Sequence, residues 1–305
     1  MKVFVTGASG HIGSLVTAEL IEAGHQVVGL SRSQAGADRL AALGAEPVLG
    51  TMDDTARLAE LAAASDGVVN LAFQHDGGDF LAAITADRAL IEAIGGALEG
   101  SGKPFLAASG TMMLAGSTAP GEVGTEDTVI DTSQAANPRA VTEGLLLGLA
   151  ARGVRSAALR FAPTVHGPSD LHGFMPSLIA AARQAGTAGY VGNGSNRWPA
   201  VHNLDAAHLI RLALEKEDLP AGIPLHAAAE VGIRFTSIAE AIGRGAGVPV
   251  RSLSQEEAVA TLGFIGNFAG VDNPTSSAAT QELLGWTPTH QGLIEDLDEG
   301  FYFTR

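Results

Sequence analysis

Three glycines at positions 7, 10 and 13 follow an apolar segment near the start of the chain. The preceding residues Val3–Val5 predict a buried strand, and the apolar spacing over residues 12–21 predicts an amphipathic helix. In such a strand–turn–helix the glycines allow a tight turn, close approach of a pyrophosphate and close helix packing. The helix N-terminus adds N–H groups and partial positive charge. The sequence therefore predicts a dinucleotide site; a tight turn without a ligand is the alternative. Its predicted nucleotide contacts are Thr6, Gly7, Ser9, Gly10, His11, Ile12 and Gly13.

The end of the second predicted strand indicates which dinucleotide is bound. A carboxylate there would hydrogen-bond the adenosine ribose of NAD, but this chain has Ser31-Arg32-Ser33. A guanidinium beside two hydroxyls suits a 2′-phosphate, which an aspartate would repel. We therefore predict NADP(H) as the cofactor; the alternative is a solvated arginine in a loop. Asp53, after the third strand, is predicted to contact the adenine or to cap the next helix.

Composition excludes several classes of protein. The chain has 305 residues, of which 46% are hydrophobic, and no apolar run reaches the ~20 residues of a membrane span. No signal peptide is visible, which predicts a cytoplasmic protein without a membrane partner. The net charge of −15 disfavours nucleic acid as a partner. The absence of cysteine excludes disulfides and thiolate chemistry, and no histidines or carboxylates have metal-site spacing.

Strand and helix patterns alternate through the first half of the chain. This order predicts an α/β fold with a Rossmann-type, doubly wound parallel sheet. Ligands gather at the carboxyl ends of such strands, so residues 6–13, 31–33, 72–79 and 109–113 are expected to line one crevice. The predicted strands are residues 2–6, 26–31, 45–49, 67–72, 104–109 and 154–161, and the predicted helices are residues 11–24, 36–43, 54–64, 79–100 and 137–152.

The regular alternation breaks after Phe161. We predict a dinucleotide-binding domain over residues 1–162 and a smaller, mostly helical substrate-binding lobe over 163–305. The two are expected to interleave, with residues 201–228 returning to the main sheet. The long segment 110–136 is expected to fold over the nicotinamide end as a substrate loop. Helices are predicted near residues 173–185, 203–216, 235–245 and 275–284.

Three ordered motifs add to the glycine turn: Asn70-Leu71-Ala72, then residues 159–167 (Leu-Arg-Phe-Ala-Pro-Thr-Val-His-Gly), then residues 198–207 (Trp-Pro-Ala-Val-His-Asn-Leu-Asp-Ala-Ala). With them the chain resembles the short-chain dehydrogenase/reductase superfamily, in its extended, epimerase-like branch. The resemblance covers nearly the whole chain and implies a small-molecule substrate and a homodimer. It also implies further cofactor contacts at Leu71, Ala72, Phe73, Ala162, Pro163, Thr164 and Val165.

The chain departs from the resembled family at its catalytic pair. That family uses a Tyr-x-x-x-Lys pair on the fifth helix, where the tyrosine moves the proton and the lysine holds the nicotinamide ribose. Counting back from Glu143, which resembles a later acidic residue of that helix, puts Ala135 and Arg139 at these positions. The chain has two tyrosines, Tyr190 and Tyr302, and neither is near this helix in sequence. The chain therefore resembles the atypical members that have lost or replaced the pair.

Other residues must then move the proton if the chain reduces a carbonyl. His75 follows the fourth strand and His166 follows the segment expected near the nicotinamide, and each has a pKa suited to proton transfer. Ser109 and Thr111 fit the positions of the assisting hydroxyl in the family, and a third route has one of them supply the proton through water. Arg139 is expected to bind the ribose and to stabilise developing negative charge.

These observations predict an NADPH-dependent oxidoreductase that reduces a carbonyl or an activated alkene of a small, fairly apolar molecule. Two alternatives stay open. A non-catalytic sensor of the NADP(H) redox state would explain the missing tyrosine. A sugar-nucleotide epimerase or dehydratase fits the resembled branch, although the sequence lacks the catalytic pair and a basic cluster for a diphosphate.

Overall fold

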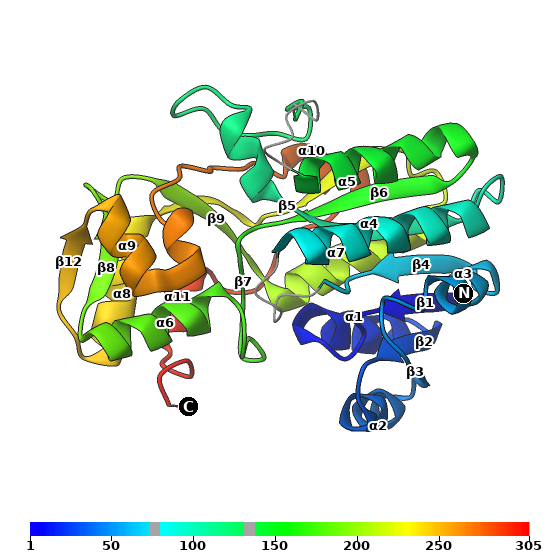
Figure 1. Ribbon diagram of the computed structural model, residues 1–305, viewed down its shortest axis with the longest axis horizontal. Coiled ribbons are helices and arrows are strands. Elements are labelled where there is room, and N and C mark those ends of the chain that lie inside the picture. Colours follow the sequence, from blue (N-terminus) through cyan, green and yellow to red (C-terminus); the bar gives the residue numbers. More distant parts are fainter. Residues whose placement is uncertain (74–79, 131–137, 305) are drawn as a thin grey trace. The chain divides into compact units, whose positions relative to one another are not determined.

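The computed structural model describes residues 1–73, 80–130 and 138–304 (Figure 1). By its internal contacts the chain divides into two compact units. Unit 1 contains Met1–Ser109, Ile130–Arg160 and Ala207–Leu225. Unit 2 contains Gly110–Val129, Phe161–Ala206 and His226–Arg305.

Unit 1 is built on a seven-stranded sheet with the order β10-β6-β5-β4-β1-β2-β3. Pairing is parallel from β3 through β5, and Val5 of β1 lies opposite both Gly29 of β2 and Val69 of β4. The predicted Rossmann-type doubly wound sheet is confirmed. Its strands are β1 (Lys2–Thr6), β2 (Gln26–Ser31), β3 (Glu46–Leu49), β4 (Gly67–Asn70), β5 (Pro104–Gly110), β6 (Arg155–Phe161) and β10 (Ile223–Ala227).

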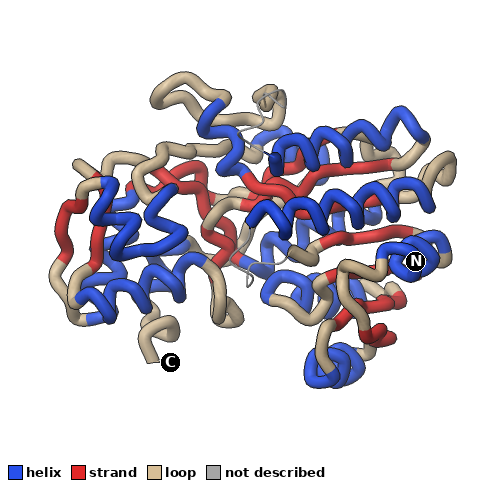
Figure 2. Tube along the Cα trace, viewed as in Figure 1, coloured by secondary structure: helices blue, strands red, loops and turns tan. Residues whose placement is uncertain are grey.

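Helices flank this sheet in the order expected for a doubly wound fold (Figures 1 and 2). They are α1 (His11–Glu22), α2 (Gln34–Leu43), α3 (Thr55–Ala63), α4 (Phe80–Ala97), α5 (Pro138–Gly148) and α7 (Asn203–Glu215). Helix α4 packs against both α3 and α5, which places it beside the strands that carry the central part of the site. Ion pairs from His208 and Arg211 to Glu19 join α7 to α1. The core between these layers includes Phe4, Leu90 and Phe105, all fully buried.

Several element ends differ from the predicted ones, for local reasons. Strand β4 stops at Asn70 rather than residue 72, where β1 turns at Gly7 (φ +64°). The last backbone hydrogen bond to β1 runs from the Leu71 N–H to the Thr6 carbonyl at 3.3 Å. Helix α2 starts two residues early, at Gln34, since the Ser33 hydroxyl accepts the Gly36 N–H at 3.1 Å.

The N-cap of α3 decides between the two roles predicted for Asp53, contact with the adenine and capping of this helix. Asp54, not Asp53, is the N-cap residue, and its Oδ1 accepts the Arg57 N–H at 3.3 Å. The Asp53 carboxylate instead accepts from the Thr51 hydroxyl at 3.2 Å. The capping role for Asp53 is therefore wrong, and contact with an adenine stays a prediction.

Unit 2 is mostly helical, with two small sheets ordered β11-β9-β7 and β12-β8. Its core centres on Trp198, Phe235 and Ile238. The strands are β7 (Thr164–His166), β8 (Ala188–Val191), β9 (Arg197–His202), β11 (Glu230–Arg234) and β12 (Val250–Leu253). The helices are α6 (Phe174–Ala185), α8 (Phe235–Ala246), α9 (Gln255–Leu262), α10 (Ala278–Leu284) and α11 (Leu293–Asp298). Across the described ranges of the chain, no helix is both long and apolar enough to cross a membrane.

Residues 110–129, expected as part of a substrate loop, are tied into unit 2. The Gly124 N–H donates to Pro274 O and its carbonyl accepts from the Ser276 N–H, each at 2.8 Å. The Glu126 carboxylate accepts from the Thr280 hydroxyl at 2.6 Å. This part of the segment is therefore a structural component of unit 2, while residues 131–136 lie outside the described chain.

Candidate functional site

The three glycines of the first turn are required for different reasons. A Cβ on Gly7 would lie 2.8 Å from the Ala72 nitrogen, and a Cβ on Gly13 would lie 2.0 Å from the Gly7 carbonyl oxygen. The packing of the chain itself therefore excludes side chains at both positions. A Cβ on Gly10 would meet only the Gly7 oxygen, at 3.1 Å. The chain barely fills the space at Gly10, which suits the close approach of a pyrophosphate.

The N-terminus of α1 also suits an anion. Gly10 is its N-cap residue, and no side chain caps the first turn. By contrast, the Ser33 side chain caps α2 and the Ser254 side chain caps α9. An uncapped first turn leaves backbone N–H groups and the positive end of the helix dipole to a ligand.

A cluster of hydroxyls lies at the carboxyl end of β2, as the sequence predicted. Ser9 Oγ and Ser31 Oγ are 3.3 Å apart, and Ser31 Oγ donates to the Ser33 carbonyl at 3.0 Å. Gly36, which the sequence analysis missed, makes room for them: its added Cβ would lie 2.2 Å from Ser31 Oγ. Arg32 is exposed beside this cluster. The Ser9 and Ser31 hydroxyls thus lie together, and Arg32 is the next residue along the chain.

Thr6 and Asn70 connect the ends of β1 and β4. Thr6 Oγ1 donates to Asn70 Oδ1 at 2.5 Å and accepts from the Ala72 N–H at 3.2 Å. Asn70 Nδ2 in turn donates to Asp87 Oδ1 of α4 at 3.2 Å. Burial raises the pKa of Asp87 from 3.8 to about 6, against the opposing effects of Arg139 and Asn70. The sequence analysis missed Asp87, because no motif surrounds it in the predicted helix.

Arg139, the cation proposed to bind the nicotinamide ribose, lies beside Phe73 and the carboxyl end of β5. Its guanidinium carbon is 4.1 Å from the centre of the Phe73 ring, and Nη2 donates to the Ala108 carbonyl at 3.3 Å. Burial lowers its pKa, while the charges of Asp87 and Glu143 raise it. The structure therefore brings together two sequence-predicted residues, Arg139 and Phe73, in a partly desolvated setting where a charge acts strongly.

Ser109 is held by a buried ion pair. Its hydroxyl donates to Glu143 Oε2 at 2.5 Å. Arg160 donates to the same carboxylate through Nε at 3.1 Å and through Nη2 at 2.6 Å. Both charged side chains are 4% exposed. Glu143 is thus fixed from two sides, and the Ser109 lone pairs remain for another partner.

The other predicted proton donors are in different settings. Thr111 is fully buried in unit 2 and its hydroxyl accepts from Asn273 Nδ2 at 3.1 Å. His166 is 1% exposed, and its Nδ1 lies 2.5 Å from Asp296 Oδ2. His75 lies outside the described residues. Neither Thr111 nor His166 presents a free polar group at a surface of unit 2.

The segment predicted to contact the nicotinamide, Ala162 to Val165, also belongs to unit 2. The Ala162 N–H donates to the Ala227 carbonyl at 3.1 Å. The Thr164 hydroxyl donates to the Pro199 carbonyl at 2.6 Å and is buried. Pro163 lies between them in the sequence. The described contacts of this segment are structural, and its contact with a cofactor stays a prediction.

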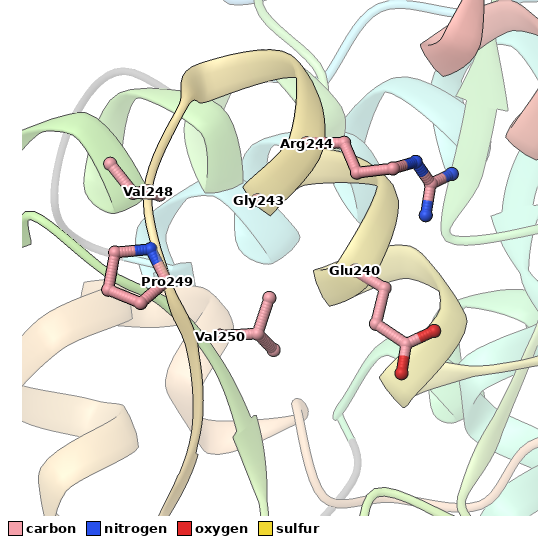
Figure 3. A pocket seen from close by; sticks show the side chains of 6 residues that line it. All are labelled: Glu240, Gly243, Arg244, Val248, Pro249 and Val250. Carbon is pink, nitrogen blue, oxygen red and sulfur yellow. The ribbon is translucent and has the colours of Figure 1, made fainter.

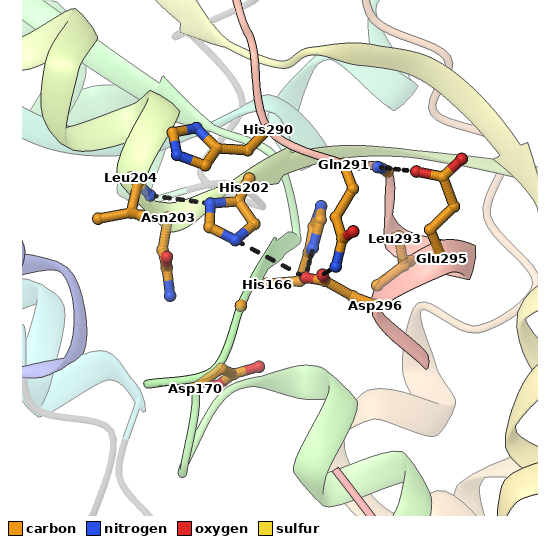
Figure 4. A network of polar contacts seen from close by, with 12 residues as sticks. His166, Asp170, His202, Asn203, Leu204, His290, Gln291, Leu293, Glu295 and Asp296 are labelled. Atoms are coloured by element: carbon orange, nitrogen blue, oxygen red, sulfur yellow. Dashed lines mark hydrogen bonds and ion pairs between the residues drawn. The ribbon is translucent and has the colours of Figure 1, made fainter. Parts of the chain in front are cut away.

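His166 is part of a wider polar network in unit 2 (Figure 4). His202 Nε2 is 3.9 Å from Asp296 Oδ2, and its Nδ1 accepts from the Leu204 N–H at 3.2 Å. The His202 and His290 rings stack with centres 4.6 Å apart. Burial lowers the pKa of His202, which favours the neutral ring that this acceptor role requires. The network supports the β7–β9 sheet and the start of α7.

Clustered histidines and carboxylates and a surface hollow of unit 2 are the other features of the described residues to consider as ligand sites. Within residues 1–73, 80–130 and 138–304, no cluster of three or more histidines and carboxylates could hold a metal ion. A surface hollow of about 380 Å³ lies at α8 and β12 (Figure 3). Its one cation, Arg244, is paired with Asp298 at 2.8 Å. The hollow is lined by Glu240, Gly243, Arg244, Val248, Pro249 and Val250.

Comparisons with known proteins agree with this geometry. The model of the NAD dependent epimerase/dehydratase family matches residues 3–224. An uncharacterized protein of Schizosaccharomyces pombe is 46% identical over 303 residues, 99% of this chain and 100% of that protein. A 4-hydroxy-2-methyl-3-oxo-4-farnesyl-3,4-dihydroquinoline-1-oxide ketoreductase of Stigmatella aurantiaca is 41% identical over 66 residues, 22% of this chain and 20% of the ketoreductase. The structure of Thermus thermophilus UDP-glucose 4-epimerase in complex with NAD has a TM-score of 0.76 at 19% identity, covering 99% of both chains, and shows a shared fold.

Proposed function

This chain belongs to the NAD dependent epimerase/dehydratase family, and we propose that it is an NADPH-dependent reductase. Its substrate is a small, fairly apolar molecule with a carbonyl or an activated alkene. The observation that carries the proposal is the space at Gly10, which the chain leaves open beside an uncapped helix N-terminus. The similarity to a ketoreductase supports the same reaction class.

The residues present fit a nicotinamide dinucleotide. Gly10 and the first turn of α1 would hold the pyrophosphate, Asp53 the adenine and Arg139 the nicotinamide ribose. When reduced and bound, the dinucleotide supplies a hydride to the substrate carbon. The further cofactor contacts that we propose are Thr6, Gly7, Ser9, His11, Ile12, Gly13, Ser31, Arg32, Ser33, Leu71, Ala72, Phe73, Ala162, Pro163, Thr164 and Val165.

The hydroxyl cluster favours NADP(H) over NAD(H). No carboxylate stands at the end of β2, and the first turn of α2 has no acidic residue. A 2′-phosphate there would accept charge-assisted hydrogen bonds from Arg32, and a further bond once the Ser31 or Ser9 hydroxyl turns from its present acceptor. Gly36 leaves the space that these hydroxyls need. Arg32 and Ser31 are therefore the proposed determinants of cofactor choice.

We assign the proton step to Ser109 and the charge stabilisation to Arg139. As the substrate oxygen becomes negative, the Arg139 guanidinium lowers the energy of that charge. The Ser109 hydroxyl donates to Glu143, so its lone pairs can hold a water molecule. That water passes a proton to the oxygen, and the hydroxide left behind takes a proton from bulk water, which completes the reduction. Ser109 holds the water and keeps its own proton on Glu143. Thr111 and His166 are already engaged by Asn273 and Asp296, which makes them the weaker candidates.

Replacing Ser109 with alanine should reduce turnover without weakening cofactor binding. We expect kcat for a reducible carbonyl to fall at least tenfold, within the usual range for a proton-transfer group. The Kd for NADPH should change less than threefold. Ser65→Ala is the matched control, because Ser65 is also a buried serine of unit 1, bonded to the Leu61 carbonyl. An unchanged kcat in Ser109→Ala would remove Ser109 from the mechanism.

Replacing Arg32 with alanine should alter cofactor choice. Loss of its charge-assisted bonds to a 2′-phosphate, each about 1.5–3 kcal/mol, predicts at least a tenfold weaker Kd for NADPH. The Kd for NADH should stay within twofold. Arg39→Ala removes the same charge from an exposed position further along α2 and should affect neither cofactor. Equal losses of both cofactors in Arg32→Ala would contradict the assignment.

One observation favours a second candidate, a non-catalytic NADP(H) sensor. Both tyrosines of the chain lie in unit 2: Tyr190 is in β8, and the Tyr302 hydroxyl donates to Asp170 at 3.0 Å. Burial raises the pKa of Tyr302 far above its usual range, so it is a poor proton donor. Tight NADPH binding without turnover on a broad panel of carbonyls and activated alkenes would favour the sensor.

A further inference from the structure

Asp87 is a buried acid that the proposed reaction does not use. It lies in the middle of α4 with 3% of its surface exposed. Its Oδ1 accepts from Asn70 Nδ2 at 3.2 Å, and the charge of Arg139 on α5 acts on its carboxylate. An unneeded buried carboxylate costs free energy, so its presence beside the proposed ribose-binding cation needs a reason.

Of the charged groups described around Asp87, Arg139 is the one whose charge acts on its carboxylate, without a direct ion pair. The other charged residues of α4 and of the adjacent α3 are exposed: Arg88, Glu92, Arg57 and Glu60. From α5, Glu143 also acts on Arg139, but it is fixed by Arg160. From β4, Asn70 contributes a neutral amide. Asp87 therefore bonds to the Asn70 amide at the end of β4, and its charge interacts with that of Arg139 on α5.

We propose that Asp87 is a positioning residue: its ionised carboxylate holds the Asn70 amide by a hydrogen bond, and its negative charge favours the orientation of Arg139 that binds the nicotinamide ribose. The inference rests on the proposed function, since it assigns the role of a residue in that nucleotide site. When Asp87 is protonated, Arg139 loses this counter-charge. Because burial raises the pKa of Asp87 to about 6, the change falls within an accessible pH range.

The test is the ratio of NADPH dissociation constants between Asp87→Asn and the wild-type protein, measured by calorimetry from pH 5.0 to 8.0. Asparagine keeps an oxygen for Asn70 but carries no charge. We expect a ratio of about ten at pH 7.5 that falls to about two at pH 5.0, where most of wild-type Asp87 is also neutral. The 2′-phosphate of NADPH also titrates, but this affects its binding to both proteins equally and therefore cancels in the ratio. Glu92→Gln removes an exposed charge from the same helix, and its ratio should stay at one.

Two further variants separate positioning from a merely structural role. In an Arg139→Met background, Asp87→Asn should have no further effect on NADPH binding, because Asp87 acts through Arg139. Asp87→Thr supplies a second uncharged side chain that can accept from Asn70, should the asparagine variant fail to fold. A ratio of one at pH 7.5, a ratio that does not vary with pH, or tighter binding in either variant would overturn the inference. If the wild-type protein binds no dinucleotide, the proposed function itself fails.

The same variant has a predicted effect on stability. The folded-state pKa of Asp87 lies above its usual value, so folding favours the neutral acid, and its ionisation lowers the free energy of unfolding as pH rises through about 6. Asp87→Asn should therefore unfold at a higher temperature than wild type at pH 7.5. That advantage should shrink toward pH 4.5. Differential scanning calorimetry at both pH values gives the comparison, and an advantage that grows at low pH would contradict it.

Discussion

Gly13→Ala is expected to abolish nucleotide binding and to destabilise the protein. The new Cβ would lie 2.0 Å from the Gly7 carbonyl oxygen and 2.8 Å from its carbon, so the glycine turn must shift. Overpacking of this kind costs about 1–3 kcal/mol or more. Loss of two charge-assisted phosphate bonds, about 1.5 kcal/mol each, would weaken binding by about 100-fold or more. Thermal unfolding and calorimetric titration with NADPH measure the two effects.

Gly148→Ala and Gly10→Ala make this test specific. Gly148 has helical backbone angles and open space at its Cβ position, so alanine there should be neutral or slightly stabilising. Gly10→Ala meets only one atom at 3.1 Å and should fold normally, yet it should lose at least tenfold in NADPH affinity. If Gly10→Ala binds NADPH like the wild-type protein, the pyrophosphate does not approach the turn as proposed.

Arg160→Met is expected to lower the free energy of unfolding by about 3–5 kcal/mol at pH 7. It leaves the Glu143 carboxylate, 4% exposed, without its cation, and an uncompensated buried charge carries a cost of this size. Ser109 remains its hydrogen-bond donor but cannot neutralise it. Urea denaturation at pH 7 measures it.

A double mutant and an exposed pair are the controls for this prediction. Glu143→Met combined with Arg160→Met removes both charges and should recover most of the lost stability. Arg244→Met breaks a pair whose members are 55% and 50% exposed, and should cost less than about 1 kcal/mol. A cost below 1 kcal/mol for Arg160→Met would mean that the Glu143–Arg160 pair is not isolated from water.

Local patterns in the sequence were sufficient to predict the parallel sheet and the glycine turn. The turn at residues 7–13 is encoded by consecutive residues, and alternating apolar segments predicted the first six strands within a few residues. Arg139 and Phe73 were placed in one site by the resemblance to the extended family rather than by local patterns. Strands after Phe161 are three to six residues long, and α9 and α11 have eight and six residues, too short for a clear periodic signal.

The hydrogen bonds that decide whether a side chain is available for proton transfer join residues far apart in the sequence. No local pattern predicts them. Thr111 meets Asn273, 162 positions away, which buries a hydroxyl that the sequence offered as a proton source. His166 meets Asp296 across 130 positions. Ser109 and Glu143 are 34 positions apart, and their hydrogen bond became visible only with the fold.

The most direct test of the central claim is calorimetric titration of the wild-type protein with NADPH and with NADH. The geometry of the glycine turn predicts that both bind, and the Ser31–Arg32 cluster predicts that NADPH binds at least tenfold more tightly. NADH binding as tight as NADPH would contradict the choice of cofactor. No binding of either dinucleotide would contradict the proposed function as a whole.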